Sequence, residues 1–325
     1  MTRHVLDVDD LSCGELEEVL ALAAAPAGAH GDLLGGRGVA LVFEKPSART
    51  RSSAELAVVA LGGHPVYVQG TEVGIDVRET AEDVARTLAC YHAAICARVL
   101  DHETLVRMSA AVDAGGGRRW PGPDDGIGTA AVPVVNLLSD AAHPCQALAD
   151  LLTLRQLLGD LGGRTLCYVG DANNVWRSLA KAAAMVGMRM RTASPEGYSP
   201  GPEDLAALGR LGADVEIGHD PVESATGADA LYTDVWTSMG QEEEATLRRA
   251  AFDGFGIDDR LLAAAAPGAA VLHCLPARRG EEISAEVLES PRSAVWRQAA
   301  NRLHAMRGLL GWLLGAGGGV GEAAS

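Results

Sequence analysis

The stretch VALVFEKPSARTRSSAELAVVALGGHPVYV, residues 39–68, decides the fold class. Its two apolar runs, Val39–Phe43 and Pro65–Val68, flank the helical pattern Ala48–Leu61, and this order indicates a βαβ unit. The same alternation continues along the chain, where the further candidate strands are Ala93–Val99, Val132–Leu137, Thr165–Gly170, Met188–Ala193, Asp214–Ile217, Ala230–Asp234 and Ala269–Leu275. Strands that alternate with helices in this way predict an α/β fold built on doubly wound parallel sheets.

The length of the chain predicts two domains, because 325 residues exceed the usual size of one domain, about 100–200 residues. We place the boundary in or just after the helical stretch Pro144–Leu158, because the glycine-rich segment Gly159–Arg164 and a new strand follow it. The predicted parts are a first domain at 1–150, completed by a C-terminal helix at 292–315, a second domain at 151–291, a surface insertion at 115–128 and a disordered tail at 316–325.

Composition narrows the function classes. Lys plus Arg number 27 and Asp plus Glu number 43, so the net charge is −16, which argues against a nucleic-acid partner or an anionic membrane surface but not against one small basic pocket. No apolar run approaches the ~20 residues that span a bilayer, and the acidic stretch Met1–Glu18 does not resemble a targeting signal. The six cysteines are scattered without a CxxC pair, which indicates free thiols of a cytosolic protein rather than a disulfide framework or a zinc site.

Polar side chains stand at or just after the carboxyl ends of six of the predicted strands. In doubly wound folds, ligands bind beyond the carboxyl ends of the strands, so these segments hold the candidate site residues. The segments are Glu44–Arg51, Arg98, Ser139–Gln146, Gly170–Asn174, Asp234–Gly240 and His273–Pro276.

The segment Ser47–Arg51 carries the strongest of these signals. Ser47 can cap the helix that follows, and Arg49 and Thr50 fall in its first turn. A helix N-terminus presents unpaired N–H groups and the positive end of the helix dipole, which suits phosphate, and the planar guanidinium of Arg49 can grip two phosphate oxygens. We therefore predict a phosphate site; the alternative is a capping serine followed by two solvated arginines.

His143 precedes another helix, with Pro144 at the first helical position. Near the positive end of the helix dipole a histidine loses affinity for its proton, so it can act as a neutral hydrogen-bond donor to a carbonyl. The alternative is a histidine that only caps a core helix.

Asp234 and Cys274 each follow a buried strand. An aspartate there can orient an amine, and a thiol of lowered pKa could help to accept a proton, although a buried structural thiol is the commoner case. The segment Gly170–Asn174 lacks the GxGxxG spacing, so no dinucleotide site is predicted.

Together these motifs resemble the aspartate/ornithine carbamoyltransferase family. The matching segments are Phe43–Arg51 (FEKPSARTR), His143–Leu152 (HPCQALADLL), Asp234–Gly240 (DVWTSMG), His273–Pro276 (HCLP) and Asn301–Ala305 (NRLHA), which occur in the family's order from about residue 38 to about residue 310. The resemblance implies two doubly wound, Rossmann-like α/β domains with the active site in the cleft between them. It also implies a homotrimer or a multiple of trimers, and no metal or cofactor. The Ser-Met-Gly and His-Cys-Leu-Pro segments point to the ornithine branch.

The resemblance further implies a role for individual residues. Carbamoyl phosphate would be held by Ser47, Ala48, Arg49, Thr50, Arg98, His143, Gln146, Cys274, Leu275 and Arg302, and ornithine by Asn174, Asp234, Ser238 and Met239. Of these, Arg98, His143, Asp234 and Cys274 would act in catalysis. A neutral δ-amine would attack the carbamoyl carbon, and its proton would pass to the leaving phosphate.

Some positions depart from the family pattern. Ala48 stands where the ornithine enzymes usually have Thr, Gly74 where a Gln or His reaches carbamoyl phosphate from the neighbouring subunit, and Ala300 where Glu is common. The insertion at 115–128 is not typical either.

These departures leave three hypotheses. The first is a cytoplasmic enzyme that makes citrulline from ornithine for arginine biosynthesis. The second is a paralogue that carbamoylates another small diamino acid, such as 2,3-diaminopropionate. The third is a non-catalytic binding subunit, against which the retained Arg49, Arg98, His143 and Arg302 argue.

Overall fold

A computed structural model of the chain describes residues 2–114, 132–237 and 242–315. The predicted insertion at 115–128, Ser238, Met239 and the predicted tail at 316–325 lie outside these described residues. The chain divides into two compact units: unit 1 comprises Met1–Cys145 and Arg302–Ser325, and unit 2 comprises Gln146–Asn301. The divisions fall inside helices α6 (Pro144–Leu158) and α13 (Val295–Leu314), so each of these helices contributes to both units.

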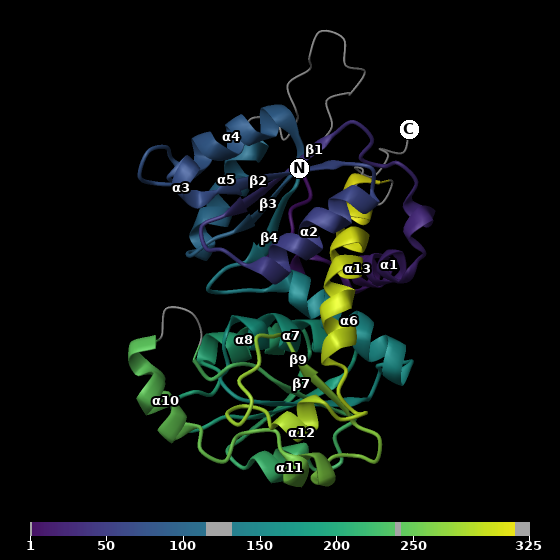
Figure 1. Cartoon of the computed structure of the whole chain (residues 1–325), viewed down its shortest axis with the longest axis vertical. Coiled ribbons are helices and arrows are strands. Elements are labelled where there is room, and N and C mark those ends of the chain that lie inside the picture. The colour runs from purple at the N-terminus through teal and green to yellow at the C-terminus, as the bar shows by residue number, and fades with distance from the viewer. Residues whose placement is uncertain (1, 115–131, 238–241, 316–325) are drawn as a thin grey trace. The chain divides into compact units, whose positions relative to one another are not determined.

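Unit 1 is built on a four-stranded parallel sheet with the order β2-β1-β3-β4. Its strands are β1 (Gly38–Phe43), β2 (His64–Gln69), β3 (His92–Arg98) and β4 (Val134–Leu138), and its helices include α1 (Cys13–Ala24), α2 (Ala48–Ala60), α3 (Gly70–Val73), α4 (Ala81–Tyr91) and α5 (His102–Ala114). Alternate residues of β1 and β3, such as Ala40 and Ile95, pack with apolar residues of α4 and α5 in one core cluster. In Figure 1, α2 and the yellow helix α13 lie on the other side of the sheet from α4 and α5.

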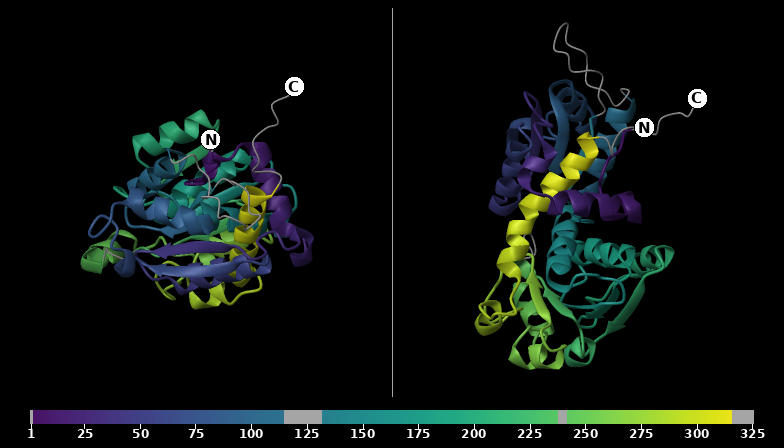
Figure 2. Two further views of the ribbon diagram at one scale, coloured as in Figure 1. Left: turned by 90° about the horizontal axis from the view of Figure 1, so that it is seen from above. Right: turned by 90° about the vertical axis from the view of Figure 1, so that its right-hand side faces the viewer.

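Unit 2 contains a five-stranded parallel sheet with the order β7-β6-β5-β8-β9. Its strands are β5 (Thr165–Val169), β6 (Arg189–Ala193), β7 (Asp214–Gly218), β8 (Ala230–Thr233) and β9 (Ala270–His273), and its further helices are α7 (Asn174–Met185), α8 (Pro202–Arg210), α9 (Pro221–Ala225), α10 (Ala245–Ala251), α11 (Asp259–Ala264) and α12 (Ala285–Leu288). Helices α7 and α8 cover one side of this sheet and α11 and α12 the other (Figures 1 and 2). Apolar side chains of β5, β8 and β9 pack with α9, α11 and α12 in a single core cluster.

The strand order explains where ligand groups gather in each unit. In unit 1 the chain leaves β1 toward β2 on one side and β3 toward β4 on the other, so the loops after β1 and β3 diverge. In unit 2 the loops after β5 and β8 diverge in the same way. Such switch points are the usual ligand sites of doubly wound sheets, and they place Ser47 with Arg98 in unit 1 and Asn173 with Asp234 in unit 2.

The predicted α/β fold with two parallel sheets is confirmed, and all nine predicted strands are present with shifted ends. Strand β9 ends at His273 rather than at Leu275, because Leu275 has a left-handed backbone with φ of 62°. Helix α7 begins at Asn174, directly after the N-cap Asn173. Of the helices in the described ranges, none is long and apolar enough to cross a membrane.

Candidate active site

The N-terminus of α2 in unit 1 forms the first part of the candidate site. The side-chain oxygen of Ser47 accepts the backbone N–H of Thr50 at 3.3 Å, which confirms Ser47 as the N-cap. The Ser47 hydroxyl also donates to Thr50 Oγ1 at 3.1 Å. Ala48 is the first helical residue, so its backbone N–H lacks a partner within the helix whatever its side chain. The helix end therefore offers backbone donors that replacement of Thr by Ala at position 48 does not remove.

Arg302 of α13 lies against this helix end. Its Nη2 donates to Thr50 Oγ1 at 2.8 Å, and its Nη1 lies 3.5 Å from Nε2 of His143. Three residues that are far apart in the sequence are thus brought together in unit 1. Arg302 and His143 are both buried.

Arg98, the last residue of β3, is only 6% exposed. Burial, with the positive charges of Arg302 and Arg49, lowers the pKa of its guanidinium to about 10. The charges that shift it are all positive, so the end of α2 carries a concentrated cationic field. Burying the two cations Arg98 and Arg302 near one another is unfavourable, and a small dianion bound here would offset that repulsion.

His143 has a strongly lowered pKa in the same place. Burial is the largest cause, followed by the positive charges of Arg302 and Arg98. The sequence predicted a neutral imidazole, and the lowered pKa agrees with that prediction. The causes of the shift are burial and two guanidinium groups, whereas the sequence argument rested on the helix dipole. A neutral imidazole retains one N–H that can donate to a carbonyl oxygen.

The lowered pKa of His143 predicts a pH-dependent stability. The unfolded histidine has a pKa near 6.5, so below that pH the unfolded state binds more protons than the folded state, and stability falls as pH falls. We expect wild type to lose free energy of unfolding between pH 7 and pH 5.5 more steeply than His143→Asn, by at most about 1.4 kcal/mol per pH unit. Urea unfolding at several pH values measures both slopes, and equal slopes would contradict the prediction.

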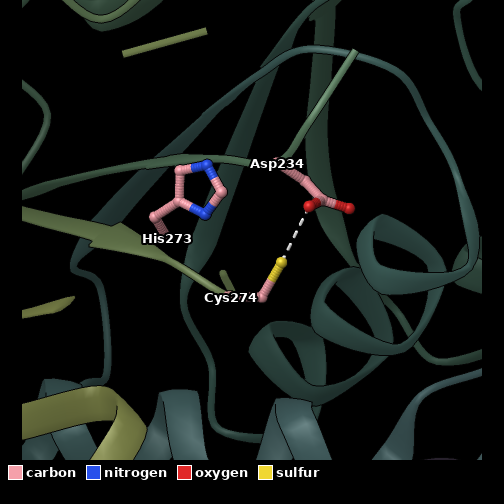
Figure 3. A group of neighbouring side chains, drawn as sticks. All are labelled: Asp234, His273 and Cys274. Carbon is pink, nitrogen blue, oxygen red and sulfur yellow. Dashed lines mark hydrogen bonds between the residues drawn. The ribbon is translucent and has the colours of Figure 1, made fainter. Parts of the chain in front are cut away.

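Asp234, directly after β8, is the centre of the candidate site in unit 2 (Figure 3). Its Oδ1 accepts the Cys274 thiol at 2.9 Å and the backbone N–H of Val235 at 2.8 Å, and its Oδ2 accepts Nδ2 of Asn173 at 2.9 Å. The sulfur of Cys274 is thus placed to donate to a carboxylate.

Asn173 is a contact of Asp234 that the sequence analysis did not single out. Its Oδ1 accepts the backbone N–H groups of Val175 and Trp176 and caps α7, so its Nδ2 must face Asp234. The predicted ligand Asn174 is the first residue of α7 and is half-buried. The preference of asparagine for the N-cap position was a signal that the sequence offered. Because Asn173 and Asn174 are adjacent, that signal identifies the capping residue only when the first residue of the helix is known.

Asp234, His273 and Cys274 also have the residue types of a metal site, and their ligand atoms lie within 4.8 Å of one another. The histidine does not fit that reading. Its Nδ1 accepts the backbone N–H of Leu275 at 2.9 Å, and its Nε2 donates to Glu282 Oε1 at 3.0 Å. Both ring nitrogens are engaged, so this ring offers no lone pair to a metal without breaking a buried contact.

Arg248 of α10 connects two of the loops near Asp234 in unit 2. Its Nη1 lies 2.8 Å from Asp171 Oδ2 and donates to the carbonyl of Trp236 at 3.1 Å. Both partners belong to segments that follow the switch-point strands β5 and β8. A nearly buried ion pair therefore ties the loop after β5 to the loop that carries Asp234.

The local backbone conformation explains why position 74 is a glycine. It ends α3 with a left-handed φ of 62°, and a Cβ at this position would lie 3.1 Å from Cγ of Arg78. A Gln or His here would be strained in this backbone conformation. Ala300 is exposed.

Two family models match successive parts of the chain. Residues 3–156 match the family model described as aspartate/ornithine carbamoyltransferase, carbamoyl-P binding domain, and residues 162–313 match the one described as aspartate/ornithine carbamoyltransferase, Asp/Orn binding domain. The chain is 50% identical over 328 residues to an ornithine carbamoyltransferase of Acidothermus cellulolyticus, with 99% of each sequence covered.

Solved structures of ornithine carbamoyltransferases are similar to nearly the whole chain. The crystal structure of ornithine carbamoyltransferase from Thermus thermophilus aligns with a TM-score of 0.82 at 41% identity, covering 97% of this chain and 100% of the other. That of the Pyrococcus furiosus ornithine carbamoyltransferase aligns with a TM-score of 0.84 at 39% identity, covering 95% and 96%.

Proposed function

The chain belongs to the aspartate/ornithine carbamoyltransferase family, and from this premise we propose that it transfers the carbamoyl group of carbamoyl phosphate to the δ-amine of L-ornithine, giving L-citrulline and phosphate. The observation that carries the proposal is the cationic cluster at the N-terminus of α2, where burial and then neighbouring positive charges lower the pKa values of both Arg98 and His143. A cluster of this kind is suited to a small phosphate dianion.

Carbamoyl phosphate is assigned to unit 1 and the adjoining turn of α6. The phosphate accepts hydrogen bonds from Ser47, Thr50, Arg49 and the backbone N–H of Ala48 at the helix end. The carbonyl oxygen faces Arg98 and His143, joined by Arg302. Gln146, in the first turn of α6, accepts the carbamoyl N–H₂. The family resemblance also assigns the backbone near Cys274 and Leu275 to carbamoyl phosphate; the N–H of Leu275 is held by His273, so its carbonyl is the group that this segment can offer.

Ornithine is assigned to the groups around Asp234 in unit 2. Asp234 is a buried acceptor already oriented by Asn173 and Cys274, and it attracts the amine. Asn174, with Ser238 and Met239 outside the described residues, is the proposed partner of the amino and carboxylate groups. A protonated Cys274 beside Asp234 acts as a hydrogen-bond donor rather than as a base.

The proposed reaction begins at the δ-amine. The lone pair of the neutral δ-amine forms a bond to the carbamoyl carbon, and negative charge builds on the carbonyl oxygen, where Arg98 and His143 stabilise it. The bond from carbon to the phosphate oxygen then breaks, its electron pair leaves with the phosphate, and one amine proton passes to that phosphate. Positioning and charge stabilisation supply the rate enhancement.

An amine panel tests the proposed function directly. Purified protein is mixed with carbamoyl phosphate and, in turn, ornithine, 2,4-diaminobutyrate, 2,3-diaminopropionate, aspartate and lysine, and each ureido product is measured. We expect citrulline to form with the highest kcat/KM. A higher kcat/KM with 2,3-diaminopropionate would identify a paralogue of different specificity, and carbamoyl phosphate binding without any product would identify a non-catalytic subunit.

We also propose that the protein is a homotrimer, or a multiple of trimers, that acts in arginine biosynthesis in the cytoplasm. Leu56 and Val59 on α2 are each 54% exposed, and the adjoining edge strand β2 is only half-buried, which favours association through this surface of unit 1. All six cysteines are free thiols, as suits a reducing compartment. Sedimentation equilibrium of the purified protein measures the mass of the assembly.

A further inference from the structure

Asp150 is a fully buried carboxylate on α6, four residues after Gln146. One of its oxygens, Oδ1, accepts two side-chain amides: Nε2 of Gln146 at 2.7 Å and Nε2 of Gln298 at 2.7 Å. A buried charge is costly unless it is hydrogen-bonded, and an apolar residue would pack here without that cost. The carboxylate therefore has a role other than filling space.

The role follows from what a carboxylate can do, since it only accepts hydrogen bonds. Gln146 has to direct its N–H₂ toward Asp150, and its carbonyl oxygen then lies at the opposite end of the amide. Gln298 is oriented in the same way, because its Oε1 accepts the backbone N–H of His273 at 2.8 Å, the residue before Cys274. Its Nε2 also lies 3.3 Å from the Tyr232 hydroxyl. One oxygen atom thus links the first turn of α6 to the end of β9.

We propose that Asp150 is a positioning residue that makes the site selective for carbamoyl phosphate over acyl phosphates that lack an N–H₂ group. This inference rests on the proposed function, since it takes Gln146 as the partner of the carbamoyl nitrogen. That nitrogen only donates, so it requires an acceptor. With the amide of Gln146 reversed, two N–H₂ groups would face each other. Asp150 prevents that reversal.

Acetyl phosphate is the matched probe, because it has a methyl group in place of the carbamoyl N–H₂ and the same phosphate. Inorganic phosphate reports on the helix end of α2 alone. Titration calorimetry with each of the three compounds therefore separates the contact of Gln146 from the cationic cluster, and it does so without requiring turnover.

Asp150→Leu has nearly the same shape and no acceptor. We expect it to weaken carbamoyl phosphate at least tenfold, the equivalent of about 1.4 kcal/mol, while the dissociation constants of acetyl phosphate and inorganic phosphate change less than twofold. Asp150→Asn can keep an oxygen toward both amides and should retain most of the preference. In a Gln146→Met background, Asp150→Leu should have no further effect on carbamoyl phosphate, because the residue through which it acts is gone.

Other outcomes overturn the inference. A general loss of packing would weaken all three ligands together, and an Asp150→Leu effect that persists in full in the Gln146→Met background would show that it acts by another route. If Asp150→Leu lacks a cooperative thermal transition, Asp150→Ser, which leaves room for water at the two amides, carries the same expectations. Wild type that fails to bind carbamoyl phosphate would refute the proposed function itself, whereas wild type that binds it and variants that keep the preference would refute only the role of Asp150.

Discussion

Arg98→Ala is expected to lower kcat for citrulline formation about 10³-fold while leaving the protein as stable as wild type or more stable. The loss in rate follows from the proposed role of Arg98 as a buried cation facing the oxygen that becomes negative in the transition state, for which one lost donor typically costs about 10²–10³-fold. The gain in stability follows from the environment of Arg98, whose pKa is lowered by burial and by the charges of Arg302 and Arg49. Removing one of three crowded cations relieves that repulsion.

Initial rates and thermal unfolding of the same preparations test this prediction. Arg86→Ala is the matched control, because Arg86 is an exposed arginine of unit 1 whose ion pair is with Asp83, and its rate should stay within twofold of wild type. Inorganic phosphate should raise the melting temperature of wild type more than that of Arg98→Ala, because the variant has lost part of the anion site. An Arg98→Ala protein that loses rate and stability in parallel would contradict a catalytic role and indicate a structural one.

Much of the fold was predictable because strand and helix patterns are local. The alternation in residues 39–68 predicted β1, α2 and β2, and the position of Ser47 before a helical pattern predicted the cap. Single residues at the ends were less predictable. Strand β9 ends earlier than predicted because Leu275 has a left-handed backbone conformation. Leucine rarely adopts this conformation, so the sequence contains no signal for it.

The candidate site likewise has residues that the sequence predicted and contacts that it did not. His143 and Arg302 were predicted from motifs and Arg98 from its place at a strand end. The structure brings His143 and Arg302 together, but no pattern in the sequence describes the cost of burying them. The supporting contacts were missed because they join distant segments. Asp150 and Gln298 are 148 positions apart, and Asp171 and Arg248 are 77 apart. Each of these residues, read alone, is an ordinary polar side chain of a helix or loop.

Asp234→Asn is expected to lower kcat/KM for ornithine by about 10²- to 10³-fold with little change in the KM of carbamoyl phosphate. An amide cannot satisfy the three donors that now surround the carboxylate. If its oxygen faces Asn173, its N–H₂ meets the backbone N–H of Val235; if it is reversed, it meets the N–H₂ of Asn173. Asn173 cannot turn to compensate, because its oxygen caps α7. The loss of one partner in a buried charged contact, typically ~2–5 kcal/mol, agrees with this range.

The control for this variant is Asp214→Asn, which removes the charge of an exposed aspartate on β7 that pairs with Arg189 and should leave both kinetic constants within twofold. The two substrates are varied separately, so that an effect on the amine is distinguished from one on carbamoyl phosphate. Because Asp234 belongs to unit 2 and the cationic cluster to unit 1, an equal rise in both KM values would mean that Asp234 maintains the fold rather than the amine site. Unchanged ornithine kinetics would instead transfer the role of acceptor away from Asp234 altogether.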